Sequence, residues 1–168
     1  MTRLLIVDGY NLIYATDRYR KWRDGDLEMA RVKLIEDLAT LQMFEDYKIM
    51  LVFDAAKTGA KGSHHANILG IDVWFTRSGE TADQMIERVV FKGGYEGDIV
   101  VATSDYNQQK VIFRPGVLRK SARELVNDLE STEKELKTTA KKGGRFRLEE
   151  RLDSALRQAL ERMAGFPE

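Results

Sequence analysis

Short apolar runs alternate along this chain with longer amphipathic stretches, the pattern typical of an α/β fold. The run at 4–7 ends at Asp8, the run at 50–53 ends at Asp54, and the stretch 99–104 ends at Asp105. Short, evenly apolar runs predict strands that are buried on both faces of a parallel sheet. Because ligands bind beyond the carboxyl ends of such strands, we expect the three carboxylates to meet at one edge.

The remaining elements follow from the same periodicities. Apolar residues recur at helical spacing from Leu27 to about Phe44, which predicts a long helix packed on the sheet. A capping box at 121–124 predicts a helix that runs to about Lys137. The other expected elements are a loop or short helix at 11–16, a loop at 55–67, a strand at 71–75, helices near 81–90, 105–113 and 148–163, and a short edge strand at 117–118.

Length and composition limit the classes of protein that fit. A chain of 168 residues suits one domain with a real core, and we find no internal repeat or long linker, so 1–168 is predicted to be a single domain. The absence of cysteine excludes disulfides and thiolate metal sites. No apolar run approaches the roughly 18 residues of a membrane span, and there is no signal-peptide pattern, so a cytoplasmic location is expected.

Charge is unevenly distributed although the net charge is zero. Residues 1–106 hold 13 basic and 17 acidic side chains, and residues 107–168 hold 14 and 10. An acidic site beside a basic segment suits a metal-dependent enzyme that acts on a polyanion, and chance variation in solvated faces is the competing interpretation.

Three basic segments are candidates for contact with RNA phosphates. In the first, aromatic residues Tyr19 and Trp22 lie among basic ones, a pattern that can hold phosphates and stack on unpaired bases, unless the aromatics simply pack on the body of the protein. The second and third are glycine-containing stretches near 57–61 and 137–147, for which plain solvated loops are the alternative. The candidate residues are Arg18, Arg20, Lys21, Arg23, Lys57, Lys61, Lys141, Lys142, Arg145 and Arg147. The adjacent His64 and His65 leave the backbone in different directions, which favours RNA contact or a solvent-exposed pair over metal binding.

The helix near 81–90 carries an acidic stripe. Glu80, Asp83 and Glu87 are three and four residues apart beside the apolar face, so their like charges repel unless a cation compensates them. Carboxylates also suit the first turn of a helix, which explains Glu80 or Asp83 without a ligand. Glu87 is too far along the helix for that explanation and pairs with a base instead, for example Arg88, if no cation is bound.

Clustered carboxylates without cysteine favour a hard divalent cation such as Mg²⁺ or Mn²⁺. Asp8, Asp83 and Asp105 meet this requirement if the strands are parallel, and such a site can hydrolyse a phosphodiester. Competing sites fit less well. The glycine patterns of dinucleotide and nucleoside-triphosphate loops are absent, and Tyr10 occupies the position where a haloacid-dehalogenase-type site needs a second aspartate.

Four motifs together resemble the NYN domains of the PIN-like nuclease superfamily, and the YacP-like branch most closely. They are the stretches 7–13, 52–55, 79–83 and 102–105, with 121–125 also typical of that branch. The resemblance covers a core of about 3–137, followed by the basic loop and C-terminal helix of about 138–168. It implies a three-layer α/β/α sandwich around a mostly parallel sheet.

The resemblance also implies the roles of the site residues and the substrate. Asp8, Asp83 and Asp105 would bind Mg²⁺ or Mn²⁺, Asn11 and Asp54 would support the site directly or from just behind it, and Glu80 would be a further acidic candidate. YacP-like proteins are associated with ribosome-linked cleavage of messenger RNA, so a ribosome partner is implied by resemblance alone.

The primary hypothesis is therefore a metal-dependent endoribonuclease. Two alternatives stay open at this point. One is an RNA- or ribosome-binding module with a degenerate site, which the retained acidic residues disfavour. The other is a nuclease acting on DNA flaps, which the absence of extra helical regions disfavours.

Overall fold

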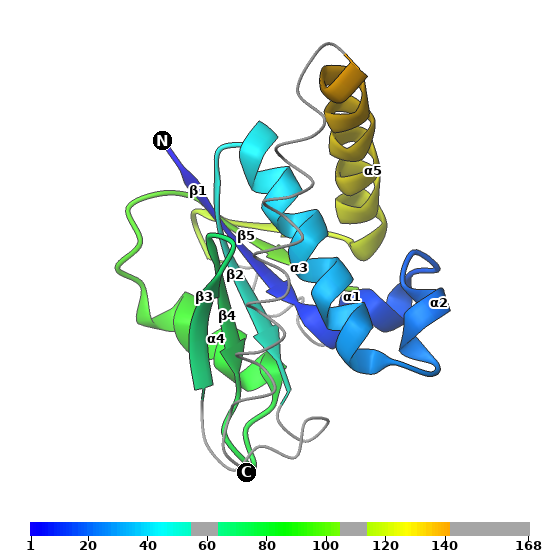
Figure 1. The fold of residues 1–168 in the computed structure, drawn as a ribbon. Coiled ribbons are helices and arrows are strands. Elements are labelled where there is room, and N and C mark those ends of the chain that lie inside the picture. The colour runs from blue at the N-terminus through cyan, green and yellow to red at the C-terminus, as the bar shows by residue number, and fades with distance from the viewer. Residues whose placement is uncertain (55–63, 105–113, 142–168) are drawn as a thin grey trace.

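The structure of this protein is a computed structural model that describes residues 1–54, 64–104 and 114–141. The described strands form one six-stranded sheet with the order β3-β4-β2-β1-β5-β6 (Figure 1). Neighbouring strands pair in parallel except for β3 and β4, which are antiparallel. The prediction of a mostly parallel sheet is confirmed. The strands are β1 (Arg3–Asp8), β2 (Tyr47–Phe53), β3 (His64–Ile68), β4 (Ile71–Phe75), β5 (Ile99–Ala102) and β6 (Val117–Lys120).

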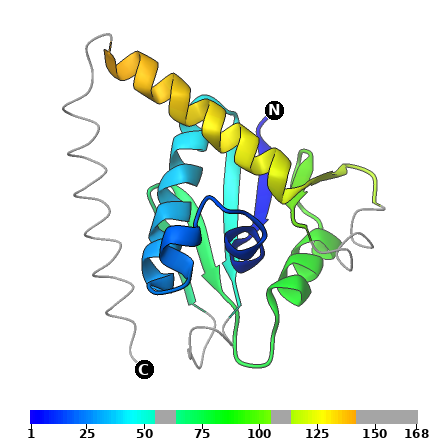
Figure 2. The same ribbon diagram turned by 90° about the vertical axis from the view of Figure 1, so that its right-hand side faces the viewer.

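Helices cover both faces of the sheet. On one face, α3 and α5 pack on each other and share a core with α1, while α4 packs on β1 and β2 from the opposite face. In Figure 2, α5 runs diagonally in front of α3, and α4 lies apart from both. The α/β/α arrangement is therefore also confirmed. The helices are α1 (Gly9–Ala15), α2 (Arg20–Arg23), α3 (Leu27–Phe44), α4 (Ala82–Lys92) and α5 (Ala122–Thr139).

The central strand β1 explains why its sequence is evenly apolar. Leu5 and Val7 belong to the core beneath α3 and α5, whereas Leu4 and Ile6 belong to the core beneath α4. Because successive side chains of a strand point to opposite faces, a strand covered on both sides needs apolar residues at every position. This burial fixes the place of β1 in the middle of the sheet.

Local signals set the helix boundaries. The Asp26 side chain accepts the Met29 N–H at the start of α3, and that helix spans the predicted residues 27–44. Capping boxes begin α4 at Thr81 and α5 at Ser121, as predicted for the latter. Helix α5 extends to Thr139, so the basic segment predicted to begin at Lys137 starts inside a helix.

The largest departure from prediction is β3, since the 55–67 segment was expected to be a loop throughout. Residues 64–68 instead pair with β4 across a tight turn at Leu69–Gly70. This strand depends on its neighbour, because its own sequence is polar and only Ile68 is buried. The helices predicted at 105–113 and 148–163 lie outside the described residues. None of the helices in the described ranges is long and apolar enough to cross a membrane.

Candidate functional site

The strand order reverses beside β1, and this reversal locates the site. From β1 the chain moves outward through β2 and β4, then returns to place β5 on the other side of β1. Open α/β sheets bind ligands beyond the carboxyl ends of the strands at such a reversal. Asp8 is the last residue of β1 and therefore lies at this point.

A cavity of about 530 Å³ opens at this edge of the sheet. Three aspartates from separate segments line it: Asp8 ends β1, Asp54 follows β2, and Asp83 lies in the first turn of α4. We call this hollow the carboxylate cavity. Among the described residues it is lined by Asp8, Tyr10, Asn11, Tyr14, Ala15, Asp54, Thr81, Ala82 and Asp83.

Asp8 is held in place by the turn from β1 into α1. Its carboxylate accepts the backbone N–H of Asn11 at 3.3 Å, so it caps α1, and only 7% of the residue is exposed. Gly9 allows α1 to begin this close to β2, because a Cβ at that position would lie 2.3 Å from the Phe53 ring. The first turn of α1 therefore approaches β2 closely and fixes the carboxylate at the cavity.

Asn11 joins two sides of the site. Its side-chain oxygen accepts hydrogen bonds from the backbone N–H and the hydroxyl of Ser104, both at 2.9 Å. This contact ties α1 to the segment after β5, across the reversal in strand order. The next residue along the chain is Asp105, which lies outside the described residues.

The acidic residues predicted to form a stripe along α4 have different surroundings in the structure. Asp83 lines the cavity at the N-terminal end of α4, where the helix dipole favours negative charge. Glu80 precedes the helix, and its side chain, only 13% exposed, pairs with Arg88 at 3.0 Å and Arg77 at 3.6 Å. Arg88 and Arg77 thus compensate the charge of Glu80, and Glu80 is not among the described residues that line the cavity.

The structure shows a contact between Tyr10 and Arg31 that the sequence did not predict. Arg31 of α3 donates a hydrogen bond from Nη1 to the Tyr10 hydroxyl at 2.7 Å. Burial raises the pKa of Tyr10 above its ordinary value, opposed by Arg31 and reinforced by the nearby charge of Asp54. Arg31 is an ordinary polar position on an amphipathic helix, so no pattern in the sequence pointed to it.

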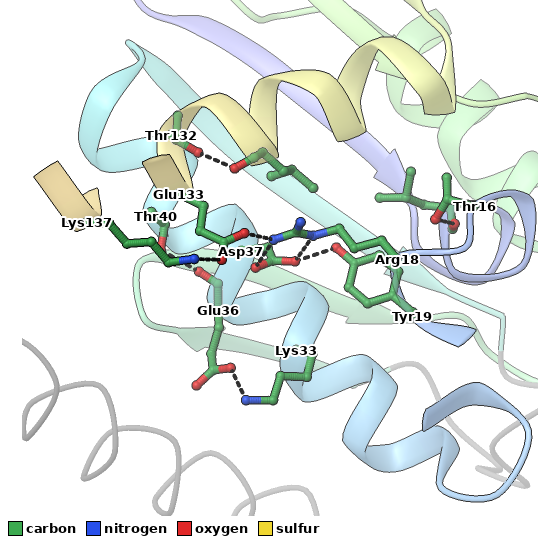
Figure 3. Close-up of polar contacts among 12 residues, drawn as sticks. Thr16, Arg18, Tyr19, Lys33, Glu36, Asp37, Thr40, Thr132, Glu133 and Lys137 are labelled. Atoms are coloured by element: carbon green, nitrogen blue, oxygen red, sulfur yellow. Dashed lines mark hydrogen bonds and ion pairs between the residues drawn. The ribbon is translucent and has the colours of Figure 1, made fainter. Parts of the chain in front are cut away.

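Two of the predicted RNA-binding arginines have structural partners instead. Arg18 pairs with Asp37 at 2.7 Å and with Glu133 at 3.0 Å, joining α3 to α5 (Figure 3). The hydroxyl of Tyr19, a fully buried residue, donates to Asp37 at 2.8 Å. We call Arg18, Tyr19, Asp37 and Glu133 the Arg18 cluster. Hydrogen bonding to Asp37 raises the pKa of Arg18, so its charge is locked into this contact.

The second of these arginines, Arg23, donates to the backbone carbonyls of Ile13, Tyr14 and Thr16. The alternative interpretation of this segment, in which its aromatics pack on the body, is confirmed for Tyr19. The exposed members of the predicted set are Arg20, Lys21 and Lys141. The other predicted contacts lie outside the described residues: Lys57, Lys61, Lys142, Arg145 and Arg147.

The histidine pair does not face the carboxylate cavity. His65 stacks on Trp74 with ring centroids 4.2 Å apart, and its Nε2 lies 3.5 Å from Asp72. Neither His64 nor His65 is among the described residues that line the cavity.

The donor set of the cavity fits a hard, hydrated cation. Mg²⁺ keeps several waters and is commonly bound by one or two carboxylates together with substrate phosphate. The described lining offers carboxylate, amide and hydroxyl oxygens, which are donors of that class. Within the described ranges, no three His, Asp or Glu side chains lie close enough to hold one ion by themselves.

Comparison with known proteins agrees with this architecture. The family model of the YacP-like NYN domain matches residues 5–165. The protein YacP of Bacillus subtilis (strain 168) is 36% identical over 140 residues, which cover 83% of this chain and 82% of that protein.

Solved structures give the same result. A crystal structure of Rae1 (YacP) from Bacillus subtilis superimposes with a TM-score of 0.69 at 34% identity, covering 94% of both chains. The structure of a single-residue variant of that protein gives a TM-score of 0.70 at 34% identity over 92% of both chains. The chain therefore belongs to the YacP-like NYN domain family, a family of nucleases.

Proposed function

We propose that this protein is an endoribonuclease that hydrolyses RNA phosphodiester bonds with Mg²⁺ or Mn²⁺. One observation carries the proposal: three aspartates from distant segments line a single cavity where the strand order reverses. Carboxylate oxygens brought to one cavity from separate segments are the donors that a hard divalent cation prefers. Membership of a nuclease family supports the same assignment.

Each residue has a distinct role in the proposal. Asp8 and Asp83 would hold the ion together with Asp105, and Asp54, which lines the same cavity, would support the site directly or from just behind it. A divalent cation bound there supplies an activated water and stabilises the leaving oxygen of the phosphodiester. Asn11 holds the segment that leads to Asp105 against α1, through its two hydrogen bonds to Ser104. We leave Glu80 out of this set because its carboxylate is paired with Arg88.

The proposed substrate is an unpaired stretch of RNA. The first turn of α4 lies at the cavity, and helix N-termini favour phosphate groups. Tyr14 lines the same cavity with 47% of its surface exposed, so its ring can stack on an unpaired base. Exposed basic residues would contact the RNA backbone; this set comprises Arg20, Lys21 and Lys141, with Lys57, Lys61, Lys142, Arg145 and Arg147 from the sequence prediction.

We propose messenger RNA in a ribosome-linked context as the cellular substrate. The support for this step is the family resemblance alone. A direct check is to ask whether ribosomes carrying a labelled messenger retain the protein and whether the messenger is cut there faster than in free solution.

The central test is cleavage of a labelled single-stranded RNA with Mg²⁺, with Mn²⁺ and with EDTA. We expect cleavage that requires a divalent ion and is lost in Asp8→Asn and Asp83→Asn. Asparagine is a good helix cap, so Asp8→Asn preserves the start of α1 while removing the charge. The matched control is Glu87→Gln, which removes an exposed carboxylate from α4 one turn beyond Asp83.

Two results would contradict the proposal. Equal cleavage by wild type and by both aspartate variants would assign the activity to something other than this cavity. Tight RNA binding without cleavage in any divalent ion would instead favour a binding module with a degenerate site.

A further inference from the structure

A stacked pair of aromatic rings lies on the edge hairpin formed by β3 and β4. The rings of His65 on β3 and Trp74 on β4 have centroids 4.2 Å apart and are inclined by 22°. Trp74 is half-buried because it packs against the core beneath α4, whereas 43% of the His65 side chain is exposed. The half-buried ring therefore supports the exposed one from below.

The register of the sheet aligns this ring pair with Asp8. Asp8 is opposite Val52 of β2, and Val52 is opposite Trp74. Trp74 is in turn opposite His65. Residues opposite each other on neighbouring strands point to the same face of a sheet, and for this row it is the face covered by α4. Neighbouring strands are about 4.8 Å apart, so His65 lies roughly 14 Å from Asp8 along the row. The ring pair is therefore beside the carboxylate cavity, at the same edge of the sheet.

The surroundings of His65 hold its ring in this orientation. Its Nε2 lies 3.5 Å from the carboxylate of Asp72, which is two residues before Trp74 on β4. Asp72 also accepts a hydrogen bond from the Asn67 side-chain amide at 3.0 Å and lies 4.0 Å from the Lys48 ammonium. A ring that is already held loses little conformational freedom when a ligand stacks on it, so more of the stacking energy remains as affinity.

An exposed ring of this kind suits an unpaired base. Proteins bind single-stranded RNA by stacking its bases on Phe, Tyr, Trp or His side chains. Trp74 covers one face of the His65 imidazole, so the opposite face is left for a base, which would extend the stack by one ring. Because a base carries no net charge, the carboxylate of Asp72 does not oppose this contact.

We propose that His65, supported by Trp74, stacks on an unpaired base of the RNA whose backbone enters the carboxylate cavity. This inference rests on the proposed function, because it assumes that the cavity receives the RNA backbone. An extended RNA strand covers roughly 14 Å in a few nucleotides, so the stacked base lies close to the cleaved bond but not at it. The inference names which histidine contacts RNA, the ring that supports it, and the part of the RNA that it contacts.

The first test compares two labelled RNAs of equal length, one with bases and one made of abasic spacers. Both have the same phosphate backbone, so the ratio of their affinities measures what the bases contribute. Affinities are measured by fluorescence anisotropy in EDTA, which prevents metal-dependent cleavage. We expect His65→Ala to bind the RNA with bases about 5- to 10-fold more weakly than wild type, at the lower end of the energy of base stacking. Its affinity for the abasic RNA should equal that of wild type.

The second test locates the stacked base. Single abasic residues are placed at successive positions on either side of the cleaved bond, and kcat/KM is measured with Mg²⁺. Wild type should lose about 5- to 10-fold at one position a few nucleotides from that bond. His65→Ala should lose nothing further at this position, because the contact is already absent.

Three further variants separate stacking from a structural role in the hairpin. His65→Phe keeps a ring and should bind both RNAs like wild type. Trp74→Leu removes the supporting ring and should weaken binding of the RNA with bases more than binding of the abasic RNA. Asn67→Ala is the matched control, since it removes a contact to Asp72 from an exposed position of the same strand and leaves both rings in place. Partial unfolding lowers the affinity for both RNAs equally, so it does not change their ratio.

The outcomes are distinguishable from failure of the proposed function. If wild type cleaves RNA and His65→Ala has the wild-type ratio of affinities, this inference alone is overturned. A loss in His65→Phe as large as that in His65→Ala would also overturn stacking, and an unchanged ratio in Trp74→Leu would overturn the supporting role of Trp74. If wild type binds RNA without cutting it, the nuclease proposal fails and the ratio of affinities still decides the inference. If wild type neither binds nor cuts RNA, both proposals fail.

Discussion

The carboxylate cavity and the hollow beside the Arg18 cluster are similar in size, about 530 Å³ and 440 Å³, but they organise charge in opposite ways. In the Arg18 cluster, Arg18 lies between two carboxylates, and Tyr19 donates to one of them. The described lining of the carboxylate cavity has three aspartates and no basic side chain. In the Arg18 cluster, ion pairs and a hydrogen bond join α3 to α5, whereas the carboxylate cavity brings acidic side chains from separate segments to one edge of the sheet.

The comparison also explains why basic residues beside aromatic ones are not sufficient to predict a contact with RNA. Arg18 and Tyr19 have the composition of a nucleic-acid contact, yet the arginine side chain is only 17% exposed and joins two helices. A charged residue is available to a substrate only where the fold has not already given it a partner. If the two regions differ in this way, mutations in the cavity should affect cleavage and mutations in the Arg18 cluster should affect stability.

The largest effect is expected from Asp83→Ala in the carboxylate cavity. Losing a ligand of a divalent ion removes several kcal/mol of transition-state stabilisation, so cleavage should fall by at least about 100-fold. The free energy of unfolding should change by less than about 1 kcal/mol, the size of a favourable charge in the first turn of a helix, where Asp83 lies. Kinetics and urea denaturation of the same preparation measure both. A large loss of stability would show that the two regions do not differ as claimed.

Arg18→Met should give the opposite result. It leaves two carboxylates without their shared partner, so we expect the free energy of unfolding to fall by about 2–3 kcal/mol. Cleavage per folded molecule should stay at the wild-type level, measured well below the melting temperature. Loss of cleavage without loss of stability would instead indicate that Arg18 contacts RNA.

Tyr14→Ala is expected to weaken RNA binding by about 5- to 10-fold, at the lower end of the energy of base stacking. Tyr14→Phe should bind like wild type, because stacking needs the ring and not the hydroxyl. The matched control is Phe91→Ala, which removes an aromatic ring of similar exposure, 49% against 47%, from α4. Anisotropy with a labelled single-stranded RNA measures all three. Equal weakening by both alanine variants would remove the stacking role.

The smallest effect is expected on how the free energy of unfolding decreases at acid pH. Hydrogen bonds from Lys137 and then Arg18 lower the pKa of Glu133 below its ordinary value. A lowered carboxyl pKa contributes stability that is complete above the unfolded value, about 4.3, and is lost as pH falls through the folded value. Glu133→Gln should therefore be less stable at neutral pH and show a shallower loss of stability below pH 4.5, measured by thermal melts. If the loss of stability with falling pH is equally steep in both proteins, protonation of Glu133 does not contribute to it.

Several features of this protein were determined by the sequence alone. The apolar run at 4–7 specified a central strand, and the residues around Ser121 specified where α5 begins. The expectation that Asp8 and Asp54 share one edge needed only parallel strands, and both line the cavity. These predictions succeeded because they depend on neighbours within a few residues or on a simple rule of strand direction.

Only the tertiary structure decided which charged groups are already paired. Arg18 finds Asp37 and Glu133 at 19 and 115 residues of separation, and Arg31 finds Tyr10 at 21. The strand β3 likewise forms because β4 offers a partner, although its own sequence is polar. Hydrophobic periodicity places a residue on a face of its element, but the partner it meets there depends on how distant elements pack. For this reason the meeting of Asp8 and Asp54 at one edge could be predicted from the sequence, while the partners of Arg18, Arg31 and Glu80 could not.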